Sequence, residues 1–490
     1  MTKPTFLIVA GILLLSSCNN KSGETHPQIS KNDRIAAVEV GLLPSLVLEG
    51  DSIKKFSLQQ AMQDNKVPGV SIAVIENGNI DWAKGYGIAK NNPKIAVDAA
   101  TLFQAASISK PISALAILQL MEEGKVHLDS NVNNYLKSWK VPENKFTKDE
   151  KVTLRRLLTH TAGTTVHGFA GYTPNDSLPS TQQVLEGKGN SALVTVDTVP
   201  GAHFKYSGGG YTIVQKVIED LSGNSFEAYM DERILKPLGM EYSTFAQPLP
   251  EQYHQNASAA FDENGKTIVG VWHDYPEKAA AGLWTTPSDL ARYIIAMQEI
   301  KAGKKGGLLT PATVTEMLSL GSFNHGLGPA VVEEDGAQLF VHGGKNAGFT
   351  NVFVAYTNEG KGLVVMTNAD NGGALLKAIE KAVSNAYDWG LSEPIIIRPI
   401  PLSDDYLQQF EGVYTYVAQV PSVGGNYVVE VRIEKGELVI FDLPEDRDYR
   451  FVATDSLQFL NLDKGEKVAF KPSGTAHVLW WNDVFEFHKN

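Results

Sequence analysis

The chain has 490 residues, 43% of them hydrophobic and 20% charged, which is enough apolar material for a packed core and excludes a disordered or fibrous protein. At about 150 residues per domain, this length predicts roughly two to four domains. The net charge of −12 argues against nucleic-acid binding as the main function, because phosphate contacts need clustered Lys and Arg. The single cysteine excludes an intramolecular disulfide and any cysteine-based zinc or iron–sulfur site.

Residues 1–17 have the features of a signal peptide. A short charged start is followed by an apolar run from Phe6 to Leu15, which is too short to cross a bilayer as a helix. The tetrapeptide Leu-Ser-Ser-Cys that ends at Cys18 resembles the bacterial lipobox, which implies cleavage before Cys18 and lipid attachment to its sulfur. An ordinary signal peptide is the alternative. We expect a lipoprotein of the bacterial cell envelope that faces the periplasm, with residues 18–45 as the tether to the membrane.

The middle of the chain predicts an α+β body over residues 46–390. β-Branched residues on both sides of Asn77-Gly78 indicate a hairpin, and a second hairpin is expected around residues 358–360. Strands near both ends with helices between them predict that the terminal strands meet in one sheet. Helices are expected over residues 109–123, 210–222, 287–300 and near 373–389.

Composition changes near residue 391. Pro394, Pro399 and Pro401 predict a linker over residues 391–402. Short alternating strands then predict a small antiparallel β sandwich or barrel over residues 403–490. The expected strands are 428–433, 437–443, 457–462, 468–470 and 478–481.

The chain lacks His-Glu-x-x-His, a Walker loop and Gly-x-Ser-x-Gly, which argues against a zinc or phosphoryl-transfer enzyme. It has Ser-x-x-Lys twice. The copy at Ser52 lies in a charged stretch without an apolar helical face after it, whereas Ser107 and Lys110 open an apolar helix with both side chains on one face. A buried lysine amine can accept the serine proton, and the helix N-terminus can stabilise an oxyanion. An ordinary serine at a helix start is the alternative reading of Ser107.

The context of Ser107 resembles the serine β-lactamase and penicillin-recognising superfamily, in particular its class C-like branch of β-lactamases, esterases and D-amino-acid peptidases. Each match alone is weak, but the ordered set is specific and covers roughly residues 55–390. The resemblance implies a β-lactamase/transpeptidase-like fold, with an antiparallel sheet flanked by helices, an all-helical region and a C-terminal small β domain. The matching segments are Phe103–Lys110, Val152–Gly163, Pro200–Gly208, Leu235–Met240, Ala281–Leu290 and His342–Gly344 followed by Gly348-Phe349.

The resemblance also implies residue roles. Ser107 corresponds to the acylated nucleophile and Lys110 to the group that helps to deprotonate it. Tyr206 corresponds to the general base for acylation, and it also activates water for deacylation. A tyrosine of the core is the alternative reading of Tyr206.

The third matched motif contributes the other side of the expected site. His342 stands in the pocket where a β-lactamase usually has lysine, with a structural histidine as the alternative. Gly344 and Lys345 follow it, and the backbone N–H groups of Ser107 and Lys345 are expected to form the oxyanion hole.

Three more residues have structural expectations. His160 lies in a matched motif and is expected to make a structural hydrogen bond. Tyr172 and Trp284 are candidates for the pocket wall, although packing is the usual role of large aromatic side chains.

Two glycines depart from the family pattern. Gly208 stands where the second motif usually has Asn, whose amide contacts the acyl-side amide of the substrate. Gly343 stands where a Thr or Ser hydroxyl often holds the substrate carboxylate. Because a charge-assisted hydrogen bond contributes roughly 1.5–3 kcal/mol, the two glycines weaken the case for β-lactams and for peptides that end in free D-alanine.

We therefore expect a lipid-anchored serine hydrolase that uses no metal or organic cofactor. It is expected to form a covalent acyl-enzyme with a small-molecule or peptide substrate, namely an ester, a β-lactam or a D-amino-acid-containing peptide. The alternative is a catalytically inert binding or sensing module of the cell envelope with the same fold.

Overall fold

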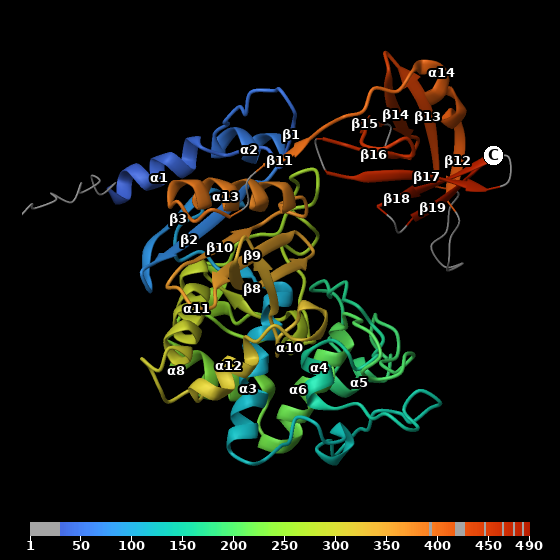
Figure 1. The fold of residues 1–490 in the computed structure, drawn as a ribbon. Coiled ribbons are helices and arrows are strands. Elements are labelled where there is room, and N and C mark those ends of the chain that lie inside the picture. Colours follow the sequence, from blue (N-terminus) through green and yellow to red (C-terminus); the bar gives the residue numbers. More distant parts are fainter. Residues whose placement is uncertain are drawn as a thin grey trace, which may run out of the picture.

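The computed structural model describes residues 30–391, 394–416, 427–444, 447–462, 465–473, 476–482 and 485–490. The predicted signal peptide and Cys18 lie outside the described residues. The described chain forms an α+β body followed by a β-barrel (Figure 1). None of the described helices combines the length and the apolar character that a membrane crossing requires.

The body is built on a seven-stranded antiparallel sheet with the strand order β4-β3-β2-β10-β9-β8-β7. The two predicted hairpins, β2–β3 and β9–β10, are confirmed, and β2 pairs with β10, with Val74 opposite Leu363. The strands from the two ends of the body therefore meet in one sheet, as the sequence predicts. The strands are β2 (Gly69–Glu76), β3 (Asn79–Asn91), β4 (Lys94–Ala96), β7 (Ala330–Glu334), β8 (Ala337–Asn346), β9 (Phe349–Tyr356) and β10 (Gly362–Thr367).

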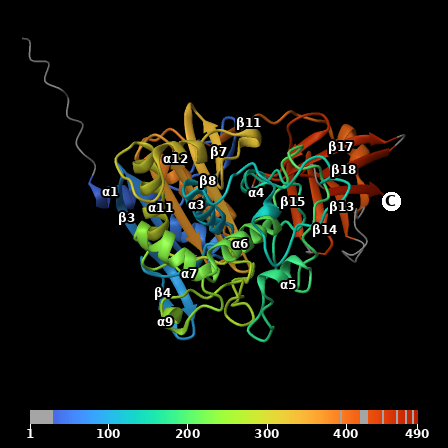
Figure 2. The same ribbon diagram turned by 90° about the horizontal axis from the view of Figure 1, so that it is seen from below.

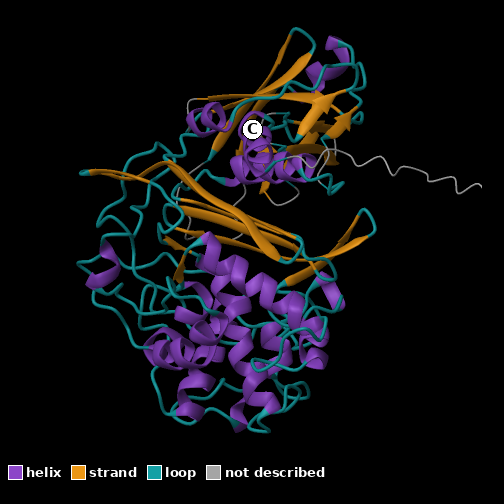
Figure 3. Ribbon diagram, turned by 90° about the vertical axis from the view of Figure 1, so that its left-hand side faces the viewer, coloured by secondary structure: helices purple, strands orange, loops and turns teal. Residues whose placement is uncertain are grey.

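Helices cover both faces of this sheet (Figure 3). On one face, apolar side chains of α1, α2 and α13 join those of β2 and β10 in one core cluster. On the other face, α11 packs against β2 and β10, and a larger core continues from there into a helical region. The helices are α1 (Lys31–Val40), α2 (Leu58–Asp64), α11 (Pro287–Lys301) and α13 (Gly373–Ala386).

The helical region surrounds α3 (Ser109–Glu122). All twelve residues from Ser109 to Leu120 are buried, so this helix is covered on every side and runs through the core. The helices α6 and α10 pack directly against it. The shorter and flanking helices are α4 (Leu154–Leu158), α5 (Thr181–Leu185), α6 (Gly208–Ser222), α7 (Phe226–Met230), α8 (Lys236–Leu238), α9 (Glu251–His254), α10 (Lys278–Ala281) and α12 (Pro311–Met317).

Both expected connecting segments contain regular structure. Within the expected tether, residues 31–40 form α1, because Ser30 caps the helix and Val38 is buried in the core cluster that α1 shares with α2 and α13. Within the expected linker, β11 (Ile395–Ile397) pairs in parallel with β1 (Leu46–Leu48). The chain therefore leaves the body only after β11.

The C-terminal domain is a closed antiparallel barrel, which resolves the expected choice between sandwich and barrel. Its first strand pairs with its last, so no edge is left open. Aromatic side chains fill the interior, with Phe410 stacked on Phe470 at 4.3 Å between ring centroids. The barrel and α1 lie on opposite sides of the body (Figures 1 and 2). The barrel elements are α14 (Asp404–Leu407), β12 (Gly412–Tyr416), β13 (Val428–Glu434), β14 (Glu437–Asp442), β15 (Arg447–Ala453), β16 (Gln458–Leu460), β17 (Lys467–Ser473), β18 (Ala476–Trp481) and β19 (Phe485–Lys489).

Candidate active site

Ser107 sits on a tight turn between a strand and the central helix. The short strand β5 (Phe103–Gln104) pairs with β6 (Trp284–Thr285), and a 3-10 turn over Ala106–Ile108 then leads into α3. Ala106 has a φ of 51°, which is the left-handed region that a residue with a Cβ rarely adopts. Such strain is often found next to reacting groups. The turn leaves Ser107 half-buried at the start of the helix.

Lys110 is held against Ser107 by two hydrogen bonds. Its Nζ donates to Ser107 Oγ at 2.8 Å and to the backbone carbonyl of Ala280 in α10 at 2.9 Å. The lysine is only 2% exposed, so these contacts form away from bulk water. The first of the two Ser-x-x-Lys copies, at Ser52, lies on an exposed segment and opens no such helix.

Tyr206 is brought to this pair by the segment that precedes α6. Lys110 Nζ lies 4.8 Å from the centroid of the Tyr206 ring. The next residue, Ser207, caps α6 by accepting a hydrogen bond from the N–H of Gly210 at 2.9 Å. The N–H of Ser207 donates to Nδ1 of His160 at 3.1 Å, and the His160 ring lies 4.2 Å from the Tyr206 ring. His160 thus makes the expected structural hydrogen bond and supports the backbone beside Tyr206.

Strand β8 closes the opposite side of the site. A Cβ on Gly344 would lie 2.1 Å from the carbonyl oxygen of Ala105, so only glycine allows the strand to approach the turn that carries Ser107. The neighbouring Gly343 is exposed, and a Cβ there would lie 3.8 Å from its nearest neighbour. Lys345 is exposed as well. The structure therefore brings the third matched motif next to the Ser107 turn.

Two buried histidines, His160 and His342, flank the tyrosine, a third, His325, packs against His160, and all three are neutral at neutral pH. Burial, and then the nearby Lys110 charge, lowers the pKa of His342 to about 3. Burial also lowers the pKa of His160 and of His325, whose rings meet edge to face at 5.0 Å. His342 Nδ1 donates to the Gly343 carbonyl at 2.6 Å, which leaves Nε2 as the unprotonated nitrogen. The His342 ring lies 6.4 Å from the Tyr206 ring, and the neutral imidazole supplies no positive charge there.

Comparison with known proteins identifies the family. The family model described as "Beta-lactamase" matches residues 57–386, which include the whole site. The chain belongs to the beta-lactamase family. Protein flp of Staphylococcus aureus is 27% identical over 232 residues, which are 47% of this chain and 44% of that protein, so this chain spans less than half of that relative.

Solved structures show the same fold. The octameric penicillin-binding protein homologue of Pyrococcus abyssi superimposes with a TM-score of 0.61 at 22% identity, covering 88% of this chain and 98% of that chain. The D-amino acid amidase of Ochrobactrum anthropi superimposes with a TM-score of 0.55 at 19% identity, covering 73% of this chain and 98% of that chain. At these identities, the structural similarity shows that this member of the beta-lactamase family has the same fold as the two solved proteins.

Two aromatic candidates for the pocket wall are packing residues instead. Trp284 is fully buried and lies between Trp272 and Phe349, and Tyr172 is 4% exposed. Tyr172 Oη accepts a hydrogen bond from the N–H of Asn190 at 2.8 Å. Both side chains therefore stabilise the folded body through buried contacts.

The sequence did not reveal every group that holds the site. Ala280 contributes a carbonyl, for which no side-chain signature exists. Gln104 belongs to a matched motif that assigns it no role, but its carbonyl oxygen accepts a hydrogen bond from Asn351 at 2.8 Å and its Oε1 accepts one from Asn346 at 2.8 Å. These amides connect the Ser107 turn to β8 and β9, and only their positions in the fold identify them.

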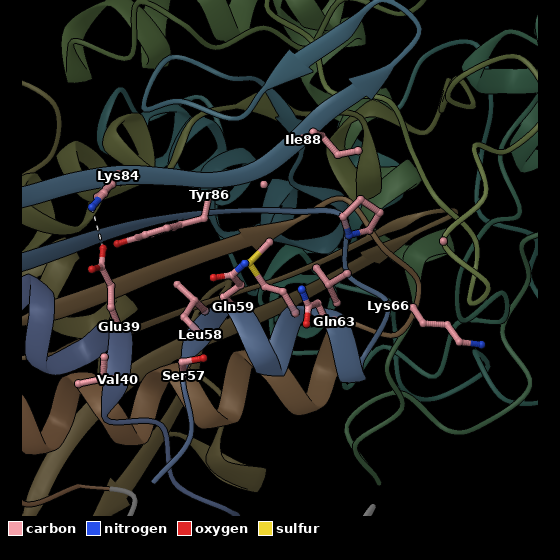
Figure 4. A pocket seen from close by; sticks show the side chains of 15 residues that line it. Glu39, Val40, Ser57, Leu58, Gln59, Gln63, Lys66, Lys84, Tyr86 and Ile88 are labelled. Atoms are coloured by element: carbon pink, nitrogen blue, oxygen red, sulfur yellow. Dashed lines mark hydrogen bonds and ion pairs between the residues drawn. The ribbon is translucent and has the colours of Figure 1, made fainter.

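A separate groove of about 780 Å³ lies between α1, α2 and β3 (Figure 4). Lys84 and Tyr86 project into it from β3, and Lys84 makes an ion pair with Glu39 at 2.7 Å. None of the described residues that we selected as catalytic candidates lines this groove. In the described part of the chain, no group of three or more His, Cys, Asp or Glu side chains is placed to hold a metal ion.

Proposed function

We propose that this protein is a serine hydrolase that forms an acyl-enzyme on Ser107. The observation that carries the proposal is the hydrogen bond of 2.8 Å between Lys110 Nζ and Ser107 Oγ, made by a lysine that the fold buries. A serine that only capped a helix would not need a buried amine against its hydroxyl. The family and the neighbouring Tyr206 ring support the same assignment.

In this reaction, Ser107, Lys110 and Tyr206 have separate roles. The Ser107 hydroxyl proton passes to the Lys110–Tyr206 pair while Oγ attacks the substrate carbonyl carbon. The carbonyl electrons move to the oxygen, which the N–H groups of Ser107 and Lys345 stabilise. Collapse of this intermediate expels the leaving group, which takes the proton. Water then attacks the ester on Ser107 and gives a proton to the same pair, and the pair returns this proton to Ser107 Oγ as the acid is released.

The substrate is an ester, a β-lactam or a D-amino-acid-containing peptide or amide, and the site favours substrates that need few polar contacts. Gly208 and Gly343 offer no side-chain donors, and the neutral His342 offers no charge for a substrate carboxylate. The Ochrobactrum structure is that of an enzyme named for D-amino acid amides, which keeps this amide class among the candidates.

The first test compares the wild type with Ser107→Ala on three substrates: a short-chain nitrophenyl ester, a chromogenic cephalosporin and a D-alanyl peptide. We expect the alanine variant to lose at least about a thousandfold in kcat/KM on the substrate that the wild type cleaves, because the nucleophile itself is removed. Its melting temperature should stay close to that of the wild type. Equal turnover by both proteins would reject Ser107 as the nucleophile, whereas no turnover together with no labelling of Ser107 by a fluorophosphonate probe would favour the inert binding module. A Tyr206→Phe variant with less than a tenfold loss would remove Tyr206 from the mechanism.

We also propose that the protein is a lipoprotein held at the cell envelope through Cys18. The proposal is supported by the charged start, the apolar run to Leu15 and the small residues before Cys18. The wild type is expected in the membrane fraction of the producing cells and Cys18→Ser in the soluble fraction. A wild-type protein that is already soluble, without a mass increase from acylation, would leave only an ordinary signal peptide.

A further inference from the structure

A loop strap, residues Thr165–Gly171, crosses the start of α6 beside the candidate base. The carbonyl of Thr165 accepts from Ser207 Oγ at 2.7 Å. The carbonyl of His167 accepts from the N–H of Gly208 at 3.0 Å. The His167 ring lies 5.0 Å from the Tyr206 ring. The strap is therefore fixed to the helix start at the point where Tyr206 enters the site.

The other end of the strap is fixed to the opposite side of the site. The Ala170 carbonyl accepts from Tyr275 Oη at 3.4 Å and lies 3.2 Å from His273 Nδ1. The same Tyr275 Oη accepts from the N–H of Ala347, directly after β8, at 3.0 Å. The strap is thus held between the Tyr206 side and the β8 side.

Phe169 in the middle of the strap covers Gly208. A Cβ on Gly208 would lie 2.8 Å from Cε2 of the Phe169 ring, and 3.1 Å from the His167 carbonyl oxygen. The ring packs against the main core with one part and remains partly exposed with the other. Phe169 therefore occupies the space that a side chain at position 208 would fill, and puts an aromatic surface there in place of a polar group.

We propose that Phe169 forms an apolar subsite for the acyl group of the substrate and selects acyl groups that carry an aliphatic chain or an aromatic ring. The inference rests on the proposed function, because it assigns a binding surface to that same site. Position 208 is expected on the acyl side, and the ring over it offers dispersion and hydrophobic contact without a hydrogen bond. An acyl group with a polar amide at this position loses the hydrogen bonds to water and gains none from the ring.

The test measures kcat/KM for nitrophenyl acetate, butyrate and hexanoate with the wild type, Phe169→Leu and Phe169→Ala. In the wild type the values are expected to rise with chain length by up to about fourfold for each methylene that contacts the ring. Phe169→Ala is expected to flatten this rise, and the apolar Phe169→Leu is expected to keep most of it. A second series, acetates with alcohols of increasing size, is expected to respond equally in all three proteins. A chain-length dependence that is unchanged in Phe169→Ala, or one that changes only in the alcohol series, overturns the subsite.

Reciprocal substitution gives an independent test. Gly208→Asn alone is expected to displace Phe169 and to lower kcat/KM for the hexanoate by about tenfold or more. On the same hexanoate, Phe169→Ala combined with Gly208→Asn is expected to lose less than the product of the two single losses, because the asparagine then has room and no ring is left to displace. Additive losses in the double variant contradict the coupling between the two positions. If no ester is cleaved in a Ser107-dependent way, the proposed function fails, whereas Ser107-dependent cleavage without acyl selection rejects Phe169 alone.

Discussion

At the residue scale, burial determines the charge state of the groups around Ser107. His160, His325 and His342 lie close together, and each has a pKa lowered first by loss of water and then by neighbouring charge. Protonating any of them would place a second positive charge near Lys110 in a medium that screens poorly. The imidazoles therefore act as neutral hydrogen-bonding and packing groups at neutral pH.

Glu277 is a second residue whose ionisation is controlled by burial. It is fully buried directly before α10, the helix whose Ala280 carbonyl holds Lys110, and neither carboxylate oxygen has a partner among the described residues. Burial raises its pKa to about 7. A protonated carboxyl is therefore favoured in the folded state over the pH range in which the unfolded chain already ionises.

The pH dependence of stability follows from that difference. The folded pKa of Glu277 is raised above the unfolded one, so its contribution is complete below the unfolded pKa of about 4.5 and is lost as pH rises through about 7. Glu277→Gln removes this loss. The advantage of the variant in free energy of unfolding is expected to grow by roughly 2–3 kcal/mol between about pH 5 and pH 8. Urea unfolding at both pH values measures it, with the exposed Glu333→Gln as control, and an advantage that does not change with pH contradicts the assignment.

At the scale of elements, the site depends on how closely β8 approaches the turn between β5 and α3. Gly344 makes the approach possible, and Ala106, in its left-handed conformation, lies at 3.3 Å from the place of a Gly344 Cβ. Two small residues from distant parts of the chain thus allow β8, which carries Lys345, to lie against the turn that carries Ser107.

Gly344→Ala is expected to separate the strand from the turn, because the new Cβ would meet the Ala105 carbonyl oxygen at 2.1 Å. Loss of one oxyanion donor lowers kcat by about a hundredfold or more. The adjacent Gly343→Ala is the matched control, since its Cβ would have 3.8 Å to the nearest atom. Ester hydrolysis and melting temperature are measured on both variants, and similar activity in the two would show that the approach of β8 is not needed.

At the scale of the whole molecule, the body and the barrel have separate cores. The apolar clusters of the body contain no barrel residue, and the barrel interior is filled by its own aromatic side chains. The connecting segment after β11 makes one backbone hydrogen bond to the barrel, from the N–H of Ile400 to Ala453 at 2.9 Å. Every candidate catalytic group comes from the body.

A chain truncated after Pro401 is therefore expected to fold and to keep its Ser107-dependent activity. It retains β11, whose pairing with β1 completes the body. We expect kcat/KM within about threefold of the full chain, because separate cores leave the site contacts in place. Ester hydrolysis and calorimetry of both forms check this expectation. A folded truncated protein that loses tenfold or more would show that the barrel contributes to the site.

Local sequence patterns were sufficient to predict many of the secondary-structure elements of this protein. β-Branched residues on both sides of Asn77-Gly78 predict the first hairpin, and the spacing of Ser107 and Lys110 predicts that their side chains share one helix face. These features depend on residues close together in the chain. In the barrel, the sequence does not predict β12, β15 and β19. β15 and β19 carry many polar side chains, and β12 pairs with β19 only when the barrel closes.

Only the tertiary structure decided what surrounds the nucleophile. The hydrogen bond from Lys110 to the Ala280 carbonyl and the contact of the Phe169 ring with Gly208 each join residues that lie far apart in the sequence. The neutral state of His342 likewise depends on burial by residues from distant parts of the chain. The sequence by itself determined which chemical groups are available and which local elements carry them. Distances between elements, and the exclusion of water that sets the charge of a buried group, exist only after the chain has packed.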